Sequence, residues 1–112
     1  MSYDISLRVT VDVGGPEPAE FCPADIGNYT SNVSPLWSEA LGRRLADLKD
    51  ANAGDSLPAL KRAVAAMEAD PDKYRPMNPK NGWGDYEGAL QYLRELRNAC
   101  TAYPNATIHI WC

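Results

Sequence analysis

The chain has 112 residues, of which 45% are hydrophobic, and a formal net charge of −4 at pH 7. This length fits one domain over residues 1–112, and the hydrophobic fraction is too high for a disordered chain. The negative charge argues against a general nucleic-acid-binding protein, which normally carries a basic surface. No hydrophobic run approaches the roughly 20 residues of a membrane span and no secretory signal is recognisable, so we expect no membrane association and a cytoplasmic location.

Hydrophobic and polar residues alternate near both ends of the chain. From Tyr3 to Val13 every second residue is hydrophobic, as in a strand with one buried face. A shorter alternation from Ala106 to Cys112 predicts a second strand. Residues 16–27 hold three prolines and show no periodicity, so we expect a loop there.

Three segments between these strands show helical spacing. Residues 28–41 are predicted to form a capped turn followed by a helix, with Asn32 or Ser34 as the cap. Gly42 is expected to end or interrupt this helix. Residues 43–49 either continue the helix or form a separate turn.

The other two helices have clear boundary signals. Asp55 or Ser56 is the expected cap of the second helix, and the pair Asp70-Pro71 ends it. Residues 71–84 are expected to be a loop that allows a short turn from Asp72 to Arg75. Asp85 is the expected cap of the last helix.

This order of elements predicts an α+β fold. The N- and C-terminal strands are expected to pair in a small antiparallel or mixed sheet, with about three helices packed on one face. Because two strands alone form a marginal sheet with open edges, the sequence also predicts a homodimer formed by sheet extension.

A first polar motif, Asn28-Tyr29-Thr30-Ser31-Asn32, places two amides and a hydroxyl at every second position. In an extended chain Asn28, Thr30 and Asn32 project to one side, and in a helix the two asparagines lie one turn apart. Amides and hydroxyls both donate and accept, which suits a polar neutral or anionic ligand. The alternative is that one asparagine caps a helix and the other forms a turn.

A second motif covers residues 78–88 and combines glycines, amides and aromatic rings. Trp83 and Tyr86 offer flat faces on which a base or sugar ring could stack, and Asn78 and Asn81 offer amides. The helix N-terminus that follows is suited to a phosphate group. The glycine spacing matches neither a Rossmann fingerprint nor a P-loop. The alternative is that Trp83 fills the core and the glycines only allow a turn.

The sequence shows no convincing catalytic or metal-binding set. Asp85 and Glu87 are two residues apart at a helix start, so they do not face each other as an acid–base pair, and Asp85 is explained as a cap. The single histidine, His109, has no evident partner. The three cysteines lack the spacing of a disulfide framework or a zinc site. We therefore expect no cofactor and no metal ion.

The two motifs together resemble those of a family of small single-domain proteins from phages and bacteria that are largely uncharacterised. The matching patterns are Asn28-x-Thr30-x-Asn32-Val33 and Asn78-Pro79-x-Asn81-Gly82-Trp83-Gly84-x-Tyr86-x-Gly88. The helix after Asp70-Pro71 and the closing Pro-x-Ala-Thr-Ile strand are similar too, so the resemblance covers most of the chain. It implies no established activity, but it suggests small counter-defence factors that sequester a nucleotide signal or block a host protein.

These observations predict a small non-enzymatic binding protein for a polar or nucleotide-like ligand. The candidate ligand-binding residues come from both motifs: Asn28, Thr30, Asn32, Asn78, Asn81, Trp83, Asp85 and Tyr86. A first alternative is a protein–protein inhibitor that presents Trp83 to a host or defence enzyme. A second alternative is a small enzyme whose nucleophile is not identifiable from the sequence.

Overall fold

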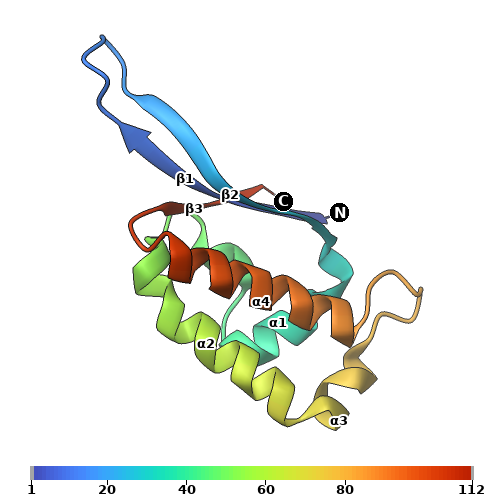
Figure 1. The fold of residues 1–112 in the computed structure, drawn as a ribbon. Helices are drawn as coiled ribbons and strands as arrows, with labels where there is room; N and C mark the ends of the chain where they lie inside the picture. The colour runs from blue at the N-terminus through green and yellow to red at the C-terminus, as the bar shows by residue number, and fades with distance from the viewer. Residues whose placement is uncertain (1, 112) are drawn as a thin grey trace.

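The computed structural model describes residues 2–111 and shows an α+β fold. Three antiparallel strands form one sheet in the order β2-β1-β3. Their bounds are Ser2–Val11 for β1, Ala19–Thr30 for β2 and Thr107–Trp111 for β3. The N- and C-terminal strands pair as predicted, with Ile5 opposite Ile110. The helices cover one face of the sheet (Figure 1).

Four α-helices and three short 3-10 turns lie between β2 and β3 within the described residues. The helices are α1 (Ser34–Leu41), α2 (Ala53–Ala69), α3 (Pro71–Tyr74) and α4 (Tyr86–Ala102), and the turns cover Ser31–Val33, Leu45–Leu48 and Arg75–Met77. Gly42 ends α1 in the left-handed conformation, as its position predicts. Among residues 2–111, no helix is both long enough and apolar enough to span a membrane.

The core lies between the sheet and the helices, because the hydrophobic faces of both meet there. The core-facing residues of β1 include Ile5 and Leu7, which are fully buried. Their helical counterparts on α4 follow the predicted stripe: Tyr86, Ala89, Leu90, Leu93, Leu96 and Cys100 are all buried. Burial of the Cys100 thiol raises its pKa to about 11.

The end of α2 is closed by a side chain from α4. In a continuing helix the carbonyl of Met67 would accept from the N–H of residue 71, but that residue is Pro71, which has none. The buried hydroxyl of Tyr86 donates to this carbonyl instead. Burial also raises the pKa of this hydroxyl, which keeps it protonated as a donor.

The prediction of a loop over residues 16–27 is wrong, because most of this segment belongs to β2. β2 is an edge strand among the described residues, and its pairing with β1 shifts register twice. Pro23 is tolerated because an edge strand leaves one row of backbone groups unpaired. The shifts and the partial burial of β2 remove the alternation by which a strand is recognised.

Two of the predicted helix caps differ in the structure. Thr30 caps the turn that leads into α1, where its hydroxyl accepts from the N–H of Asn32 at 3.3 Å. Asn52 caps α2 and accepts from the N–H of Asp55 at 2.9 Å. Asp85 caps α4 as predicted. The two errors have one cause, because several neighbouring residues can cap and backbone geometry selects among them.

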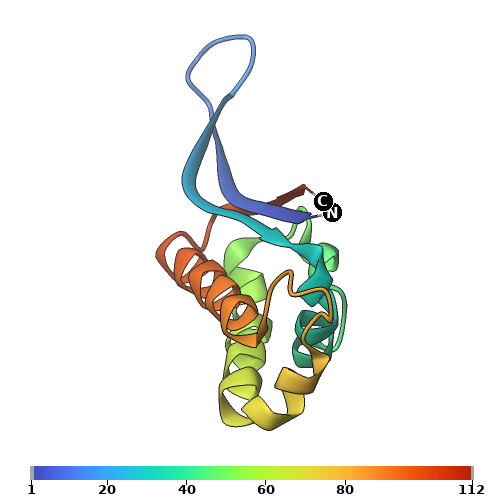
Figure 2. The same cartoon turned by 90° about the vertical axis from the view of Figure 1, so that its right-hand side faces the viewer.

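The hairpin of β1 and β2 extends well beyond β3 and the helical layer (Figures 1 and 2). β3 pairs with β1 only from Asp4 to Arg8, so the rest of β1 has β2 as its one strand neighbour among the described residues. The molecule is consequently elongated, with extents of 53 × 26 × 18 Å.

Candidate functional site

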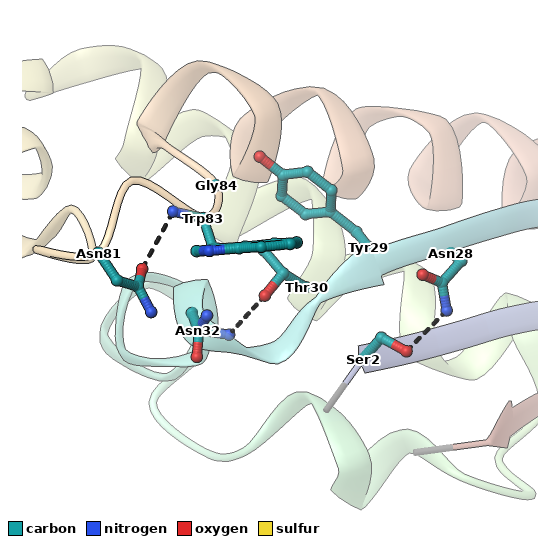
Figure 3. Close-up of a pocket in the computed structure, with 8 residues that line it drawn as sticks. All are labelled: Ser2, Asn28, Tyr29, Thr30, Asn32, Asn81, Trp83 and Gly84. Carbon is teal, nitrogen blue, oxygen red and sulfur yellow. Dashed lines mark hydrogen bonds between the residues drawn. The ribbon is translucent and has the colours of Figure 1, made fainter.

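An open pocket of about 720 Å³ lies where the end of β2 meets the loop before α4 (Figure 3). Its lining comes from the start of β1, from the first motif and from the second: Ser2, Asn28, Tyr29, Thr30, Asn32, Asn81, Trp83 and Gly84. The two motifs, far apart in the sequence, therefore form one site. Five of the eight predicted ligand-binding residues line it, namely Asn28, Thr30, Asn32, Asn81 and Trp83.

The first motif follows β2 into the turn before α1. The Asn28 side chain donates from Nδ2 to the Ser2 hydroxyl at 2.9 Å, which links the two strands at the pocket. Thr30 is occupied as a cap through its hydroxyl oxygen. The side-chain amide of Asn32 is exposed and has no hydrogen-bond partner among residues 2–111. Of the two asparagines in this motif, Asn32 is thus the one whose side-chain amide makes no hydrogen bond with the described residues.

The second motif forms a tight turn that carries Trp83 outward. Gly82 and Gly84 have φ of 76° and 90°, values that side-chain-bearing residues rarely adopt. The Asn81 side-chain oxygen accepts from the N–H of Trp83 at 3.0 Å and fixes the turn. Trp83 is 68% exposed, so the alternative in which it fills the core is wrong. Its ring extends over the pocket between Asn81 and Thr30 (Figure 3).

Two glycines, Gly84 in the loop and Gly88 in the first turn of α4, allow this region to approach β2 closely. A Cβ on Gly84 would lie 2.6 Å from Cγ2 of Thr30, and one on Gly88 would lie 2.0 Å from the hydroxyl oxygen of Tyr29. That hydroxyl accepts from the N–H of Asp85 at 3.2 Å, although the two residues are 56 positions apart. Gly84 and Gly88 are therefore required for the close approach that creates the pocket.

Three lining residues were not among the predicted ligand-binding residues, namely Ser2, Tyr29 and Gly84. Tyr29 makes the most contacts of structural consequence. Its ring stacks on Tyr92, with centroids 5.8 Å apart, and contacts Trp37 at 6.2 Å. The Tyr92 hydroxyl donates to the Gly27 carbonyl at 2.7 Å, and burial raises the pKa of this hydroxyl, so it stays neutral. Tyr29 pairs with Tyr3 across the sheet, so the alternation of β2 would have identified it had that strand been recognised.

Three predicted ligand-binding residues do not line the pocket. Tyr86 is 4% exposed and its ring packs in the core, so it offers no stacking face. It lies on the buried stripe of α4, and helical spacing determines that placement. Asp85 is occupied as the α4 cap, where it accepts from the N–H of Gly88 at 2.7 Å. Asn78 lies outside the lining, and its buried Oδ1 has no hydrogen-bond partner within residues 2–111.

The pocket is polar but carries no charge. None of its lining residues is Asp, Glu, Lys, Arg or His. The α4 N-terminus, which the sequence suggested as a phosphate site, is already capped by the carboxylate of Asp85. A negative charge there opposes a second anion, so the expected phosphate contact at this helix end is not supported.

No protein-family model matches the chain, and searches of curated proteins and of solved structures found no match. Within residues 2–111, no three His, Cys, Asp or Glu side chains are grouped closely enough to hold a metal ion.

Proposed function

We propose that this protein is a non-enzymatic binding module for a small polar ligand that contains a flat, uncharged ring, such as the base of a nucleotide-like molecule. The observation that carries the proposal is the convergence of an exposed indole ring and free amide groups on one open pocket. These groups come from two motifs that the fold brings together through the contact between Tyr29 and Asp85.

Trp83 would supply most of the binding free energy. Its ring is 68% exposed, so a ligand ring stacked on it would remove apolar surface from water. Stacking of a base on an aromatic side chain contributes about 1–3 kcal/mol. The Asn81–Trp83 hydrogen bond holds the turn before the ligand arrives, which reduces the entropy lost on binding.

The amides would supply orientation. The Asn32 side chain has an unused donor and an unused acceptor, which together match the edge of a base or a pair of sugar hydroxyls. The Asn81 side chain uses its oxygen within the turn, which leaves its NH2 group to donate to a ligand. Because the lining is uncharged, we expect a nucleoside to bind about as well as the corresponding nucleotide.

Isothermal titration calorimetry against nucleosides, mononucleotides, cyclic dinucleotides and simple saccharides tests the proposal. We expect Trp83→Ala to weaken binding of the best ligand by about tenfold or more, which corresponds to about 1.4 kcal/mol. Trp111→Ala is the matched control, because Trp111 is 74% exposed but lies on β3 outside this pocket. If no panel member binds the folded protein, or if both substitutions weaken binding equally, the proposal fails.

The exposure of the Trp83 side chain also favours a second candidate function, a protein–protein inhibitor anchored by Trp83. A large aromatic side chain on a loop, surrounded by polar groups, is typical of a binding hot spot. A stoichiometric protein partner that is lost with Trp83→Ala and retained with Trp111→Ala would support this candidate over the first. The counter-defence role stays a prediction from the family resemblance.

A further inference from the structure

The second feature of interest is the far end of the β1–β2 hairpin, where a hydrophobic face continues beyond the core. Ile5 and Leu7 on the core-facing side of β1 are fully buried under the helices. The same side continues to Val11, the last residue of β1, which is 42% exposed. Val13, two residues beyond the strand, is 60% exposed. The β1–β2 hairpin extends past the helical layer (Figures 1 and 2). The exposed fractions of the two valines show that the other described residues leave much of each side chain uncovered.

The neighbouring strand enlarges this hydrophobic face. Phe21 lies directly opposite Val9 in the β1–β2 register and therefore on the same side of the sheet. Phe21 is 54% exposed. Residues 9–13, which are the last three residues of β1 and the two that follow it, form together with Phe21 what we call the arm. Val9 is half-buried against the core, whereas Val11, Val13 and Phe21 are exposed.

The arm also has an open strand edge. β3 pairs with β1 as far as Arg8, so the edge of residues 9–13 that continues beyond β3 has no strand neighbour within residues 2–111. The outer edge of β2 is different, because it carries Pro23, the charged Glu20 and Asp25, and a bulged register. Such features oppose strand pairing. Residues 9–13 contain one charged residue, Asp12, and no proline, and the register is unshifted from Val9 to Val11.

The sequence of this edge is complementary to itself. Residues 9–13 read Val-Thr-Val-Asp-Val, so in hydrophobicity they form the same pattern in both directions around Val11. Antiparallel pairing of two copies about a two-fold axis at Val11 places Val9 opposite Val13, and Val11 opposite its own counterpart. Thr10 then faces Asp12, whose Oδ1 already accepts from the N–H of Gly14 at 2.9 Å. The Thr10 hydroxyl can donate to the other carboxylate oxygen, and no like charges meet. A symmetric dimer interface requires this kind of self-complementarity.

We propose that residues 9–13, the end of β1 and the two residues that follow it, pair antiparallel with the same residues of a second copy of this chain. The arms would form a continuous ribbon in the order β2-β1-β1-β2, with the valines and Phe21 of both copies on one face. The arm alone is small compared with interfaces that bury about 1,200–2,000 Å². The dimer is therefore weak and forms in the micromolar range or above.

Analytical ultracentrifugation of the full chain from about 1 µM to about 500 µM tests the dimer. We expect the average mass to rise from that of one chain to that of two. Val11→Lys places the ammonium groups of the two copies opposite each other at the two-fold axis. Their repulsion should keep the protein monomeric over the whole concentration range. Val13→Lys, beyond the end of β1, should weaken the dimer without touching the folded strand. Trp111→Lys, on the edge strand β3 opposite Asp4 and away from residues 9–13, is the control and should still dimerise.

Disulfide cross-linking tests the register. In a background with Cys22→Ser and Cys112→Ser, oxidised Val11→Cys should give a covalent dimer, because directly opposed Cβ atoms lie about 4.5–5.5 Å apart and need only a small shift to bridge. Thr10→Cys should cross-link far less, because its counterpart lies two positions away. A monomer at every concentration, a dimer that persists in Val11→Lys, or equal cross-linking of both cysteine variants would overturn the proposal.

This proposal and the proposed ligand pocket can fail separately. The pocket is lined by Ser2, nine residues before Val11 on the same strand, which is about 30 Å away. Val11→Lys is therefore expected to leave ligand binding at Trp83 unchanged, and Trp83→Ala to leave the dimer unchanged.

Discussion

Substitution of Gly88 by alanine tests the contact that joins the loop before α4 to β2. An alanine Cβ would lie 2.0 Å from Oη and 2.7 Å from Cζ of Tyr29, so the tyrosine must move. Tyr29 cannot rotate away without loss, because its ring stacks on Tyr92 and its hydroxyl accepts from the N–H of Asp85. The substitution therefore acts on the same contact that brings the two motifs together.

The expected effect on stability is opposite to that of an ordinary helix substitution. On an exposed helix, Gly→Ala stabilises by about 1 kcal/mol. Here the lost Tyr29–Asp85 hydrogen bond costs about 1 kcal/mol, the disturbed Tyr29–Tyr92 stack about 1 kcal/mol, and the overpacking at least another 1 kcal/mol. We expect Gly88→Ala to lower the free energy of unfolding by about 2 kcal/mol.

Urea denaturation of the wild type, Gly88→Ala, Tyr29→Phe and the double variant measures this effect. Tyr29→Phe removes the atom closest to the new Cβ, so it should cost about 1 kcal/mol alone but less, or nothing, beside Gly88→Ala. A Gly88→Ala protein that is more stable than the wild type by about 1 kcal/mol would refute the reasoning, because it would show ordinary helix propensity without a clash.

Three further outcomes follow from other contacts. Asp85→Ala should lower the free energy of unfolding by about 1 kcal/mol through loss of the α4 cap, and Asp85→Asn should restore most of it in the same urea assay. Tyr86→Phe leaves the buried Met67 carbonyl without its donor and should cost about 1–3 kcal/mol, measured by thermal unfolding. Burial raises the pKa of the Cys100 thiol from 9.0 to about 11, so the unfolded state loses this proton at a lower pH than the folded state does. Stability should therefore fall from about pH 9 to pH 11, by at most about 1.4 kcal/mol per pH unit, and a flat urea midpoint over this window would contradict the assignment.

Local signals in the sequence determined much of the fold. The alternation from Tyr3 to Val13 predicted β1, and the helical stripe ending at Cys100 predicted α4 with Asp85 as its cap. These predictions succeed because each depends on neighbours in the chain, whose spacing directly reflects strand or helix geometry. The pairing of the terminal strands could also be inferred, since each has one hydrophobic face to bury.

The tertiary structure decided what the sequence left open. β2 exists because β1 offers it a partner, even though its proline and its lack of alternation predict a loop. Tyr86 is drawn into the core, whereas Trp83, three residues earlier, remains exposed because Gly82 and Gly84 turn the backbone outward. The sequence thus supplied the two polar motifs. Only the long-range contact of Tyr29 with the loop before α4 made them one pocket, and such contacts between distant residues leave no periodic signal along the chain.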